Sequence, residues 1–446
     1  DGKQRLEDPP DKGEALARTT QAKATTSVFN DLLSGLESSH IDQNSSGGDG
    51  VSEVNLDGST LEGGGQLLRN AFAYAAVLGR TMRVFNIRGG RREPGMRPSH
   101  VAAVRALQQL SHLKLRGVAV QSTEATVAPD IPGVFESDTT QDIPPTADAG
   151  TGGSTMLMLQ TLLPVMLAKS AASGGAKVTM NLCGGTNVAP LHCNGPCSLT
   201  APQVDYAQLV LLPMLRRLLG FSLDLALRQR GFLNGGGEVE VNAVSPSWPW
   251  PSFELISLGR PVRVRGVAYR SAGVPAHVLD RMIEGQMKKK RAGAAVVIAE
   301  HLPEATVEWD LQEVESVNGA DAVGIVIAIE NSTGCILAGD SMGRKGTPAE
   351  KVGEEAARAA LASLRTGSCV DEHLEDQLVI FMALAAGISR MRIGKRSPTL
   401  HTQTALWVAK NIGANVRMEE DADGHIIVVE GIGSSCKLGA QVNRTE

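Results

Sequence analysis

Aromatic side chains make up only 3% of the 446 residues. So few rings argue against a surface on which successive bases of a single-stranded nucleic acid stack. An excess of positive charge is missing as well, because 43 basic residues face 48 acidic ones and the net charge is −5. This balance excludes a uniformly basic surface that coats the phosphates of a duplex. It does not exclude a local site for one phosphorylated end.

Long hydrophobic runs are also lacking. The longest apolar stretches, around residues 156–168 and 207–215, are broken by Gln, Pro, Lys or Arg. Neither approaches the roughly 20 apolar residues that span a membrane, and residues 1–30 lack the basic-then-apolar pattern of a signal peptide. We therefore expect no membrane association. The hydrophobic content of 42% is ordinary for a globular protein, and the length is enough for two or three domains.

Cysteine is scarce too. Six cysteines do not make a disulfide framework in so long a chain, which predicts free thiols in a reducing compartment. His192, Cys193 and Cys197 lie close together in the sequence, with Cys183 upstream. A structural zinc site usually needs four ligands at more regular spacing. The favoured interpretation is therefore an ordinary loop, with a metal site as the alternative.

Negative charge is concentrated at the start of the chain. Residues 1–53 carry ten acidic and five basic side chains, which leaves 38 of each sign in the rest. The same segment is polar and rich in Ser, Gly and Asp. This composition cannot bury enough apolar surface to fold, so it predicts a disordered leader over 1–53.

From residue 54 onward, strand-like and helix-like segments alternate. "VNLDGST" (54–60) predicts a strand and a turn, "EGGGQLLRNAFAYAAVLG" (62–79) a glycine-rich loop that leads into an apolar helix, and "TMRVFNI" (81–87) another strand. A similar succession recurs between 177 and 244. The sequence therefore predicts repeated α+β units, with loop insertions at 119–145 and 188–201.

A Pro/Trp-rich stretch, "SPSWPWPS" (245–252), predicts a domain boundary. We expect a core domain that occupies 54–245, an inserted domain over 246–365, and a return to the core over 366–440.

Three glycines precede a predicted helix in "LEGGGQLLR" (61–69). No Gly-Lys-Ser/Thr follows, so the stretch is not a P-loop. Backbone without side chains at a helix start can still approach a phosphate. In that interpretation Glu62 can hold a metal ion and Arg69 can bind phosphate. A tight turn and a helix cap are the alternative.

Arginines and glycines alternate in "IRGGRREPGMR" (87–97), which contains Arg88, Arg91, Arg92 and Arg97. Guanidinium groups suit phosphate, whereas a solvated charged surface is the alternative. The run "MKKKR" (287–291) is interpreted as a solvated surface, with nuclear targeting or RNA contact as the alternative.

His401 stands among hydroxyl residues in "SPTLHTQTALWV" (397–408), where a polar stretch becomes apolar. This pattern predicts a helix start with Ser397, Thr399 or Thr402 as the N-cap. The N-terminus of a helix disfavours a protonated imidazole, and a neutral imidazole is both a nucleophile and a ligand.

These stretches together resemble one family. "DGSTLEGGGQLLR", "IRGGRREPGMRPSHVAAV", "APQVDY", "RGFLNGGGEVEV", "DEHLEDQLVIFMALAAGISR" and "TLHTQTA" occur in family order. They resemble the RNA 3′-terminal phosphate cyclases in their eukaryote-like form, over about residues 54–433. The resemblance implies an α+β fold: a core of three similar α+β units, like the C-terminal domain of translation initiation factor 3, with a smaller inserted α/β domain.

The resemblance also implies a reaction with ATP, a divalent metal (Mg²⁺ or Mn²⁺) and RNA that ends in a 3′-phosphate. His401 would attack the α-phosphate of ATP, the RNA phosphate would take the AMP, and the 2′-hydroxyl would then expel AMP to leave a 2′,3′-cyclic phosphate. The last step needs a 2′-hydroxyl, so DNA is not an expected substrate.

Further site residues follow from the resemblance. It implies that Glu62 lies near the metal and the triphosphate, and that Pro202 packs on the adenine. It implies a phosphate-facing set formed by Gln66, Arg69, Arg88 and Arg91. It implies a set of nucleotide contacts formed by Gln160, Asp376, Gln377 and His373.

The sequence departs from the family at several places. His373 replaces the tyrosine of Tyr-Leu-x-Asp-Gln, and Ser99 replaces a glutamine before His100. The leader 1–53 has no family counterpart. The insertion at 188–201 lies directly before Pro202.

A different class of function is the alternative. The superfamily includes catalytically inactive cyclase-like proteins that act in ribosome assembly and lack the nucleophilic histidine. His401, Arg88, Arg91 and the Asp376–Gln377 pair favour the enzyme. By resemblance we expect the nucleus, with the cytoplasm as the alternative, and the oligomeric state stays open.

Overall fold

The computed structural model describes residues 30–31, 53–130, 144–188, 201–286, 291–315, 318, 321–436 and 438. Most of the predicted leader, residues 131–143 and 189–200 of the two predicted loop insertions, Cys193 and Cys197 lie outside these ranges. The prediction of a loop over 119–145 is wrong at Ala125–Pro129, which form a strand of the first sheet. Within the leader, Asn30 bonds through its side-chain amide to the backbone of Met418: it donates to the carbonyl at 3.2 Å and accepts from the N–H at 3.0 Å.

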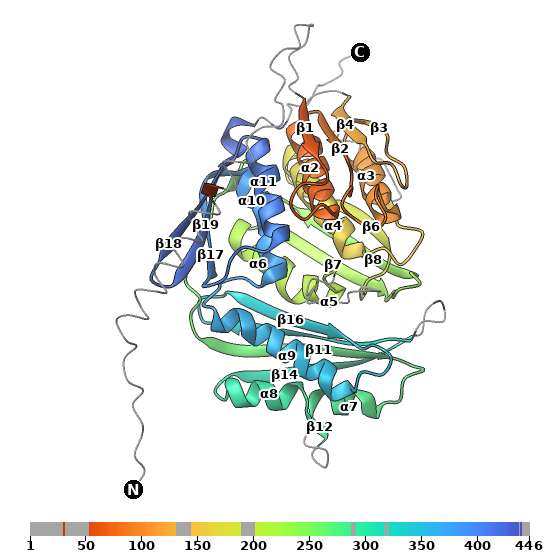
Figure 1. Cartoon of the computed structure of the whole chain (residues 1–446), viewed down its shortest axis with the longest axis vertical. Helices are drawn as coiled ribbons and strands as arrows, with labels where there is room; N and C mark the ends of the chain where they lie inside the picture. Colours follow the sequence, from red (N-terminus) through yellow and green to blue (C-terminus); the bar gives the residue numbers. More distant parts are fainter. Residues whose placement is uncertain are drawn as a thin grey trace, which may run out of the picture.

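The first unit has a four-stranded sheet in the order β1-β2-β4-β3. Strands β1 and β2 are parallel, whereas β4 runs antiparallel to both of its neighbours. Two helices accompany the sheet, and Figure 1 shows the unit in red and orange at the upper right. Its elements are β1 (Val54–Asp57), α2 (Gly65–Leu78), β2 (Met82–Phe85), α3 (Pro98–Leu110), β3 (Leu113–Arg116) and β4 (Ala125–Pro129).

The second unit repeats this topology, with the strand order β5-β6-β8-β7. Strands β5 and β6 are again parallel, and β8 is antiparallel to β6 and β7. Its elements are β5 (Thr146–Asp148), α4 (Thr155–Ala172), β6 (Val178–Gly184), α5 (Val204–Tyr206), η1 (Ala207–Leu211), α6 (Leu212–Leu219), β7 (Ser222–Gln229) and β8 (Gly237–Val244).

The third unit contains the order β10-β17-β19-β18, and β9 also pairs with β17. The parallel pair is now β10 and β17, and β19 is antiparallel to β17 and β18. Figure 1 shows most of this unit in blue at the left. Its elements are β9 (Trp250–Pro251), β10 (Glu254–Leu255), α10 (Glu372–Leu384), β17 (Ala385–Gly394), α11 (Leu400–Asn411), β18 (Asn415–Asp421) and β19 (Gly424–Ile432).

The prediction of three similar α+β units is therefore confirmed. Alternating burial along β1, β6 and β8 places one side of each strand in the core, as expected for sheets with one covered face. Helix α4 is long and apolar enough to cross a membrane by length and composition, but 72% of it is buried inside the protein. We interpret it as a core helix that packs between α2, α3 and the strands of its own sheet.

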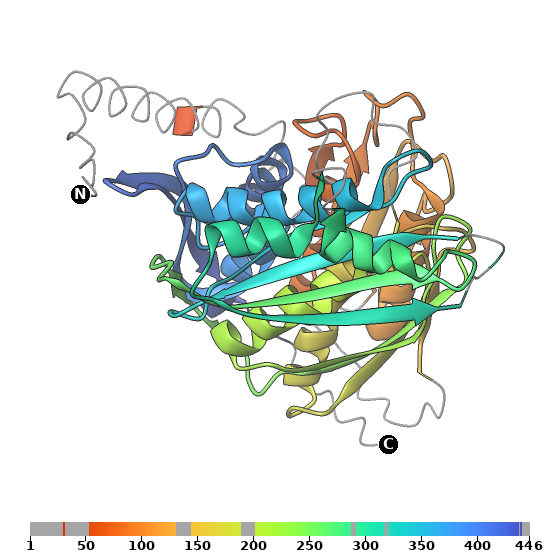
Figure 2. The same ribbon diagram turned by 90° about the horizontal axis from the view of Figure 1, so that it is seen from below.

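The inserted unit has its own sheet in the order β14-β11-β15-β16. Figure 2 shows helices of this unit lying across one face of that sheet. A separate apolar cluster, which includes Val264, Met282 and Ile298, fills the space between them. The elements are β11 (Pro261–Ser271), α7 (His277–Ile283), β12 (Gly285–Gln286), β13 (Arg291–Ala292), α8 (Ala294–His301), β14 (Thr306–Val314), β15 (Val323–Asn331), β16 (Ile336–Met342) and α9 (Ala349–Arg365).

The inserted sheet starts later than the predicted boundary at 246. Strands β9 and β10 pair with β17 in the third core unit, and the strands of the inserted sheet begin at Pro261. The tertiary environment explains the difference. Trp250 is 1% exposed and contacts the rings of Phe221 and Phe381, so it attaches this Pro/Trp stretch to the core.

The described cysteines are free thiols, as predicted: Cys183, Cys335, Cys369 and Cys436.

Candidate functional site

A glycine-rich loop leads into α2 and brings polar groups close to the backbone. Gly63 adopts a left-handed φ of +56°, which glycine tolerates without strain. A Cβ placed on Gly65 would lie 2.6 Å from both a terminal nitrogen of Arg69 and Nε2 of His100. A Cβ on Gly64 would collide with the carboxylate of Glu62. Glycine is therefore required for the packing of Glu62, Arg69 and His100 around the loop.

Glu62 lies at the centre of this loop with its side chain 9% exposed. Its Oε1 forms an ion pair with Arg91, while its Oε2 is buried and has no hydrogen-bond partner. Among the residues that the structure describes, no group of three or more His, Cys, Asp or Glu is arranged to hold a metal ion. Mg²⁺ commonly binds through one or two carboxylates together with substrate phosphates. The unpaired oxygen of Glu62 fits a cation held in that way.

Helix α2 contributes Gln66 and Arg69, which are 2% and 7% exposed. Arg69 donates to Oε1 of Gln66 at 2.6 Å. Burial lowers the pKa of Arg69, while the negative charges of Glu62 and Asp376 oppose that shift. The guanidinium thus faces carboxylates from two units of the fold.

The predicted basic turn lies next to the glycine-rich loop. Arg91 donates to the backbone carbonyl of Glu62 at 2.9 Å. Arg88 has a left-handed φ of 54° and donates to the carbonyls of Glu93 and Gly95 at 3.0 and 3.2 Å. A non-glycine residue in this region is uncommon and costs about 1–3 kcal/mol, and such residues occur in turns and cluster at functional sites. The turn is therefore held in a fixed, strained shape.

His100 belongs to this group, although the sequence did not place it among the site residues. Its Nδ1 accepts a hydrogen bond from the backbone N–H of Arg97 at 3.1 Å. Burial lowers the pKa of His100 to about 3, helped by the charges of Arg69, Arg88 and Arg97. The ring is therefore neutral. Its position directly after a basic turn was the signal that sequence reasoning left unused.

His401 lies in the first turn of α11, as predicted. Thr399 is the N-cap, and its hydroxyl accepts from the N–H of Thr402 at 3.1 Å. Nδ1 of His401 lies 3.9 Å from Oδ2 of Asp376, and the side chain is 26% exposed. Thr404, further along the helix, accepts from the N–H of Glu62 at 3.2 Å. That bond joins the first and third units beside the imidazole.

The electrostatic environment keeps His401 neutral. Burial lowers its pKa to about 4, and the positive charges of Arg69, His373 and Arg91 act in the same direction, whereas Glu62 opposes them. An imidazole with this pKa is unprotonated at pH 7 and can act as a nucleophile.

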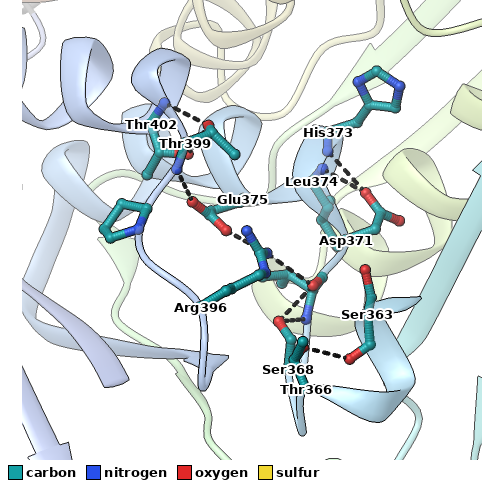
Figure 3. Close-up of polar contacts among 12 residues, drawn as sticks. Ser363, Thr366, Ser368, Asp371, His373, Leu374, Glu375, Arg396, Thr399 and Thr402 are labelled. Atoms are coloured by element: carbon teal, nitrogen blue, oxygen red, sulfur yellow. Dashed lines mark hydrogen bonds and ion pairs between the residues drawn. The ribbon is translucent and has the colours of Figure 1, made fainter. Parts of the chain in front are cut away.

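A buried ion pair fixes the two helices that carry His401 and Asp376. Glu375 of α10 is fully buried, accepts from the N–H of Thr399 at 3.1 Å and pairs with Arg396. Figure 3 shows Glu375 between Thr399 and Arg396. Asp371 caps the same helix by accepting from the N–H groups of His373 and Leu374 at 3.0 and 2.9 Å. The sequence did not indicate Glu375 or Arg396 as site residues, because the groups that they contact are distant in the sequence.

Asp376 and Gln377 meet Gln66 and Gln160 at a narrow pocket between α2, α4, η1 and α10. Asp376, Gln377 and Gln160 each have a buried side-chain oxygen without a hydrogen-bond partner. Buried polar atoms are normally paired, so this set is open to a ligand or to water. Burial raises the pKa of Asp376 to about 7, although Arg69 and His373 oppose the shift.

The structure thus brings together most of the predicted residues from three units. The group comprises Glu62, Gln66, Arg69, Arg88, Arg91, Gln160, Asp376, Gln377 and His401. His373 lies beside it and contacts Tyr206 edge-on, with ring centroids 5.2 Å apart. Pro202 is buried two residues ahead of α5. Arg92 is exposed and stands outside it.

A neutral imidazole, three arginines and an unpaired carboxylate oxygen form an arrangement suited to phosphate groups. The comparisons with known proteins assign the class. The model of the family described as RNA 3′-terminal phosphate cyclase matches residues 60–418.

Curated relatives agree with this family match. The chain is 32% identical over 386 residues to the RNA 3′-terminal phosphate cyclase of Pyrobaculum neutrophilum, which covers 85% of this chain and 99% of the relative. It is 34% identical over 368 residues to the RNA 3′-terminal phosphate cyclase of Ignicoccus hospitalis, and the match covers 82% of this chain and 94% of the relative. It is 32% identical over 364 residues to the probable RNA 3′-terminal phosphate cyclase of Dictyostelium discoideum, and the match covers 80% of this chain and 76% of the relative.

The protein is therefore an enzyme of the RNA cyclase class. It belongs to the RNA 3′-terminal phosphate cyclase family.

Proposed function

We propose that this protein uses ATP to convert the 3′-terminal phosphate of RNA into a 2′,3′-cyclic phosphate, through a covalent histidine–AMP intermediate. The observation that carries the proposal is the place of His401. Its pKa is about 4, and it lies among Arg69, Arg91, Glu62 and Asp376. A neutral imidazole surrounded by phosphate-binding cations is suited to attack a phosphorus atom.

Asp376 orients the nucleophile. It faces Nδ1 of His401 at 3.9 Å, a distance that a small movement shortens to a hydrogen bond. Nε2 is then the attacking atom. In the first step a bond forms between Nε2 and the α-phosphorus, and the bond from that phosphorus to the pyrophosphate oxygen breaks.

The arginines hold the phosphates. Arg69 and Arg91 flank Glu62, and Arg88 lies close enough to Glu62 and Arg91 to be influenced by both charges. Guanidinium groups pair with phosphate oxygens in two-point contacts and stabilise charge that develops in the transition state. A divalent cation bound at Glu62 would neutralise phosphate charge there.

Two further steps complete the reaction. An oxygen of the RNA 3′-phosphate attacks the AMP phosphorus and displaces His401, which leaves an RNA-adenylate. The adjacent 2′-hydroxyl then attacks the terminal phosphorus, loses its proton and expels AMP. Because the attacking oxygen of this last step belongs to the ribose, cyclisation requires a 3′-terminal ribose and cannot occur at a 2′-deoxyribose.

Incubation of the full chain with α-labelled ATP and Mg²⁺ or Mn²⁺ tests the proposal. We expect acid-labile AMP on the wild-type protein and none on His401→Ala. His301→Ala is the matched control, because His301 is exposed and lies on α8 of the inserted unit. That variant should label like wild type. Absence of label on the wild-type protein would favour the inactive, ribosome-assembly type of relative.

The RNA step is tested with 3′-phosphorylated oligonucleotides. An all-ribose oligonucleotide should yield the cyclic phosphate. An oligonucleotide whose last sugar is 2′-deoxyribose should accept AMP but not cyclise. Release of AMP from the deoxy substrate at the rate seen with the all-ribose one would contradict the third step, because no 2′-oxygen is present to expel it.

A further inference from the structure

The inserted unit contacts the start of α10 through strand β16. The N–H of Ala338 donates to Oδ2 of Asp371 at 2.9 Å. Two residues further along β16, Oδ1 of Asp340 lies 3.7 Å from Nε2 of His373. Asp371 and His373 belong to the N-terminus of the helix that also carries Asp376. The inserted unit therefore contacts the candidate site directly and not only the outer surface of the core.

The carboxylate of Asp340 is held in place from its other side. Its Oδ2 accepts a hydrogen bond from Nε2 of Gln203 at 2.8 Å, and Gln203 in turn accepts from the hydroxyl of Tyr269 at 2.7 Å. Gln203 and Tyr269 are fully buried. The remaining oxygen of this fixed carboxylate, Oδ1, is the one that faces His373.

The imidazole of His373 is enclosed on several sides. Tyr206 contacts its ring edge-on, with an interplanar angle of 71°, and the hydroxyl of Tyr206 donates to Oδ1 of Asp371 at 2.7 Å. The side chain of His373 is only 14% exposed. The family's tyrosine at this position is replaced by a ring that can carry charge.

We propose that Asp340 is the positioning residue of His373, and that the inserted unit thereby forms one wall of the nucleotide site. The proposal rests on the proposed function, in which ATP binds at this site, and on the family resemblance, which implies that His373 contacts the nucleotide. Asp340 itself touches neither ATP nor RNA in this proposal. It acts by holding the imidazole in one orientation and by pairing with its positive charge.

The charges around the ring support this role. Burial alone would lower the pKa of His373, but the nearby carboxylate of Asp340 raises it to about 9, with Asp371 and Asp376 acting in the same direction. Tyr206 from α5 and His401 from α11 also face this region. Burial and the same three carboxylates raise the pKa of Tyr206, and burial and the charge of His373 lower the pKa of His401. Asp340 is the one carboxylate among these groups that comes from the inserted unit.

A positive His373 has a chemical consequence. An imidazolium beside the nucleotide attracts a polyanion and disfavours protonation of His401. Because the pKa of His373 lies near 9, the charge persists across pH 6–8 and is lost as the pH rises through 9. Among the groups that raise the pKa of His373, Asp340 contributes most. Without Asp340, the imidazole should therefore lose its proton within the physiological pH range.

The test compares Asp340→Asn with a matched control, Asp310→Asn, in the full chain. Both changes are isosteric and lie in the inserted unit, but Asp310 is exposed on β14, the opposite edge of the sheet. Histidines labelled with ¹³C at Cε1 are titrated by NMR, and His373 is assigned with His373→Gln. In wild type and in Asp310→Asn, we expect His373 to titrate near pH 9. In Asp340→Asn its pKa should fall toward the ordinary value of about 6.5.

ATP binding gives the second measurement. At pH 8 we expect Asp340→Asn to bind ATP several-fold more weakly than Asp310→Asn, with kcat for cyclisation little changed and KM for ATP raised. At pH 5.5 the difference should largely disappear, because the imidazole of both proteins is then protonated.

The outcomes separate the two proposals. A wild-type protein that does not bind ATP overturns the proposed function, and this inference with it. A wild-type protein that binds ATP, together with an unchanged titration of His373 in Asp340→Asn, overturns the inference alone. So does a loss of ATP affinity that is the same at pH 5.5 and pH 8, since that pattern indicates structural damage rather than loss of an ion pair.

Discussion

Glu375 and Thr399 are joined by a hydrogen bond of 3.1 Å, in which the buried carboxylate accepts from the backbone N–H of the residue that caps α11. This bond fixes the start of the helix that carries His401 relative to the helix that carries Asp376. The same carboxylate pairs with Arg396. Removal of one partner from a buried pair leaves the other charge uncompensated, which typically costs about 3–5 kcal/mol.

We therefore expect Glu375→Ala to lower the free energy of unfolding by about that amount and to reduce adenylylation of the molecules that remain folded. Chemical denaturation measures the first effect. Glu354→Ala is the control, because Glu354 pairs with Arg358 on the exposed surface of α9, where such pairs contribute about 1 kcal/mol or less. Equal losses in the two variants would show that Glu375 has no special structural role.

Gly65→Ala should impair the site more than the fold. The added Cβ would lie 2.6 Å from Arg69 and His100, and both side chains must then move away from the positions in which they face the phosphates. We expect adenylylation to fall by about tenfold or more, which corresponds to about 1.4 kcal/mol of activation free energy. Gly90→Ala, which meets no atom within 4 Å, should retain activity. A Gly65→Ala protein that labels at the wild-type rate would contradict the assigned packing.

Asp376→Asn should stabilise the protein at high pH while it reduces activity. The pKa of Asp376 is about 7 when folded, against about 3.9 in an unfolded chain. The folded state therefore binds the extra proton, and stability falls as the pH rises from about 4 to 7. The amide mimics the neutral carboxyl, so Tm should exceed that of wild type at pH 8 and match it near pH 4. Thermal melts check this, with the exposed Asp224→Asn as control; a gain that does not depend on pH would refute the assignment.

His373→Tyr should preserve or tighten ATP binding. The larger phenol ring covers more of the adenine, which we expect to offset the loss of the imidazolium charge, and its hydroxyl can donate to the carboxylate of Asp340. Equilibrium binding of ATP measures the effect. Asp340→Asn should then reduce the affinity for ATP less in His373→Tyr than in wild type, because the tyrosine carries no positive charge for Asp340 to stabilise. A several-fold loss of affinity in His373→Tyr would indicate that the imidazole makes a polar contact that the phenol cannot replace.

Removal of residues 1–53 should leave kcat unchanged and take the net charge from −5 to zero. KM for RNA should be equal or slightly lower at low salt and equal at high salt, since salt screens charge over about 10 Å at 0.1 M. Loss of the two hydrogen bonds between Asn30 and Met418 should lower stability by about 1–2 kcal/mol, at the usual contribution of about 1 kcal/mol for each bond. Steady-state cyclisation across a salt series tests this. A fall in kcat with the circular dichroism spectrum unchanged would make the leader part of the active structure.

The sequence by itself determined those features that depend on neighbouring residues. Thr399 caps α11 because its hydroxyl reaches an N–H three residues away, and the glycine-rich loop before α2 follows from local backbone freedom. The order of strands and helices in the three units also follows from the local pattern. For this reason the amino-acid sequence alone is enough to name His401, Glu62, Arg69 and the basic turn as candidates.

Only the tertiary structure decided which of these groups meet. The contact between Glu62 and Thr404 joins residues 342 positions apart, and no local pattern specifies it. The neutral state of His401 and the raised pKa of Asp376 result mainly from burial, which depends on how the units pack. The burial of Trp250 in the core also depends on packing, and for this reason the inserted sheet begins later than predicted. The approach of Asp340 to His373 from another unit depends on packing as well. Burial and long-range charge are properties of the assembled fold, because each requires partners that the chain brings together only when it folds.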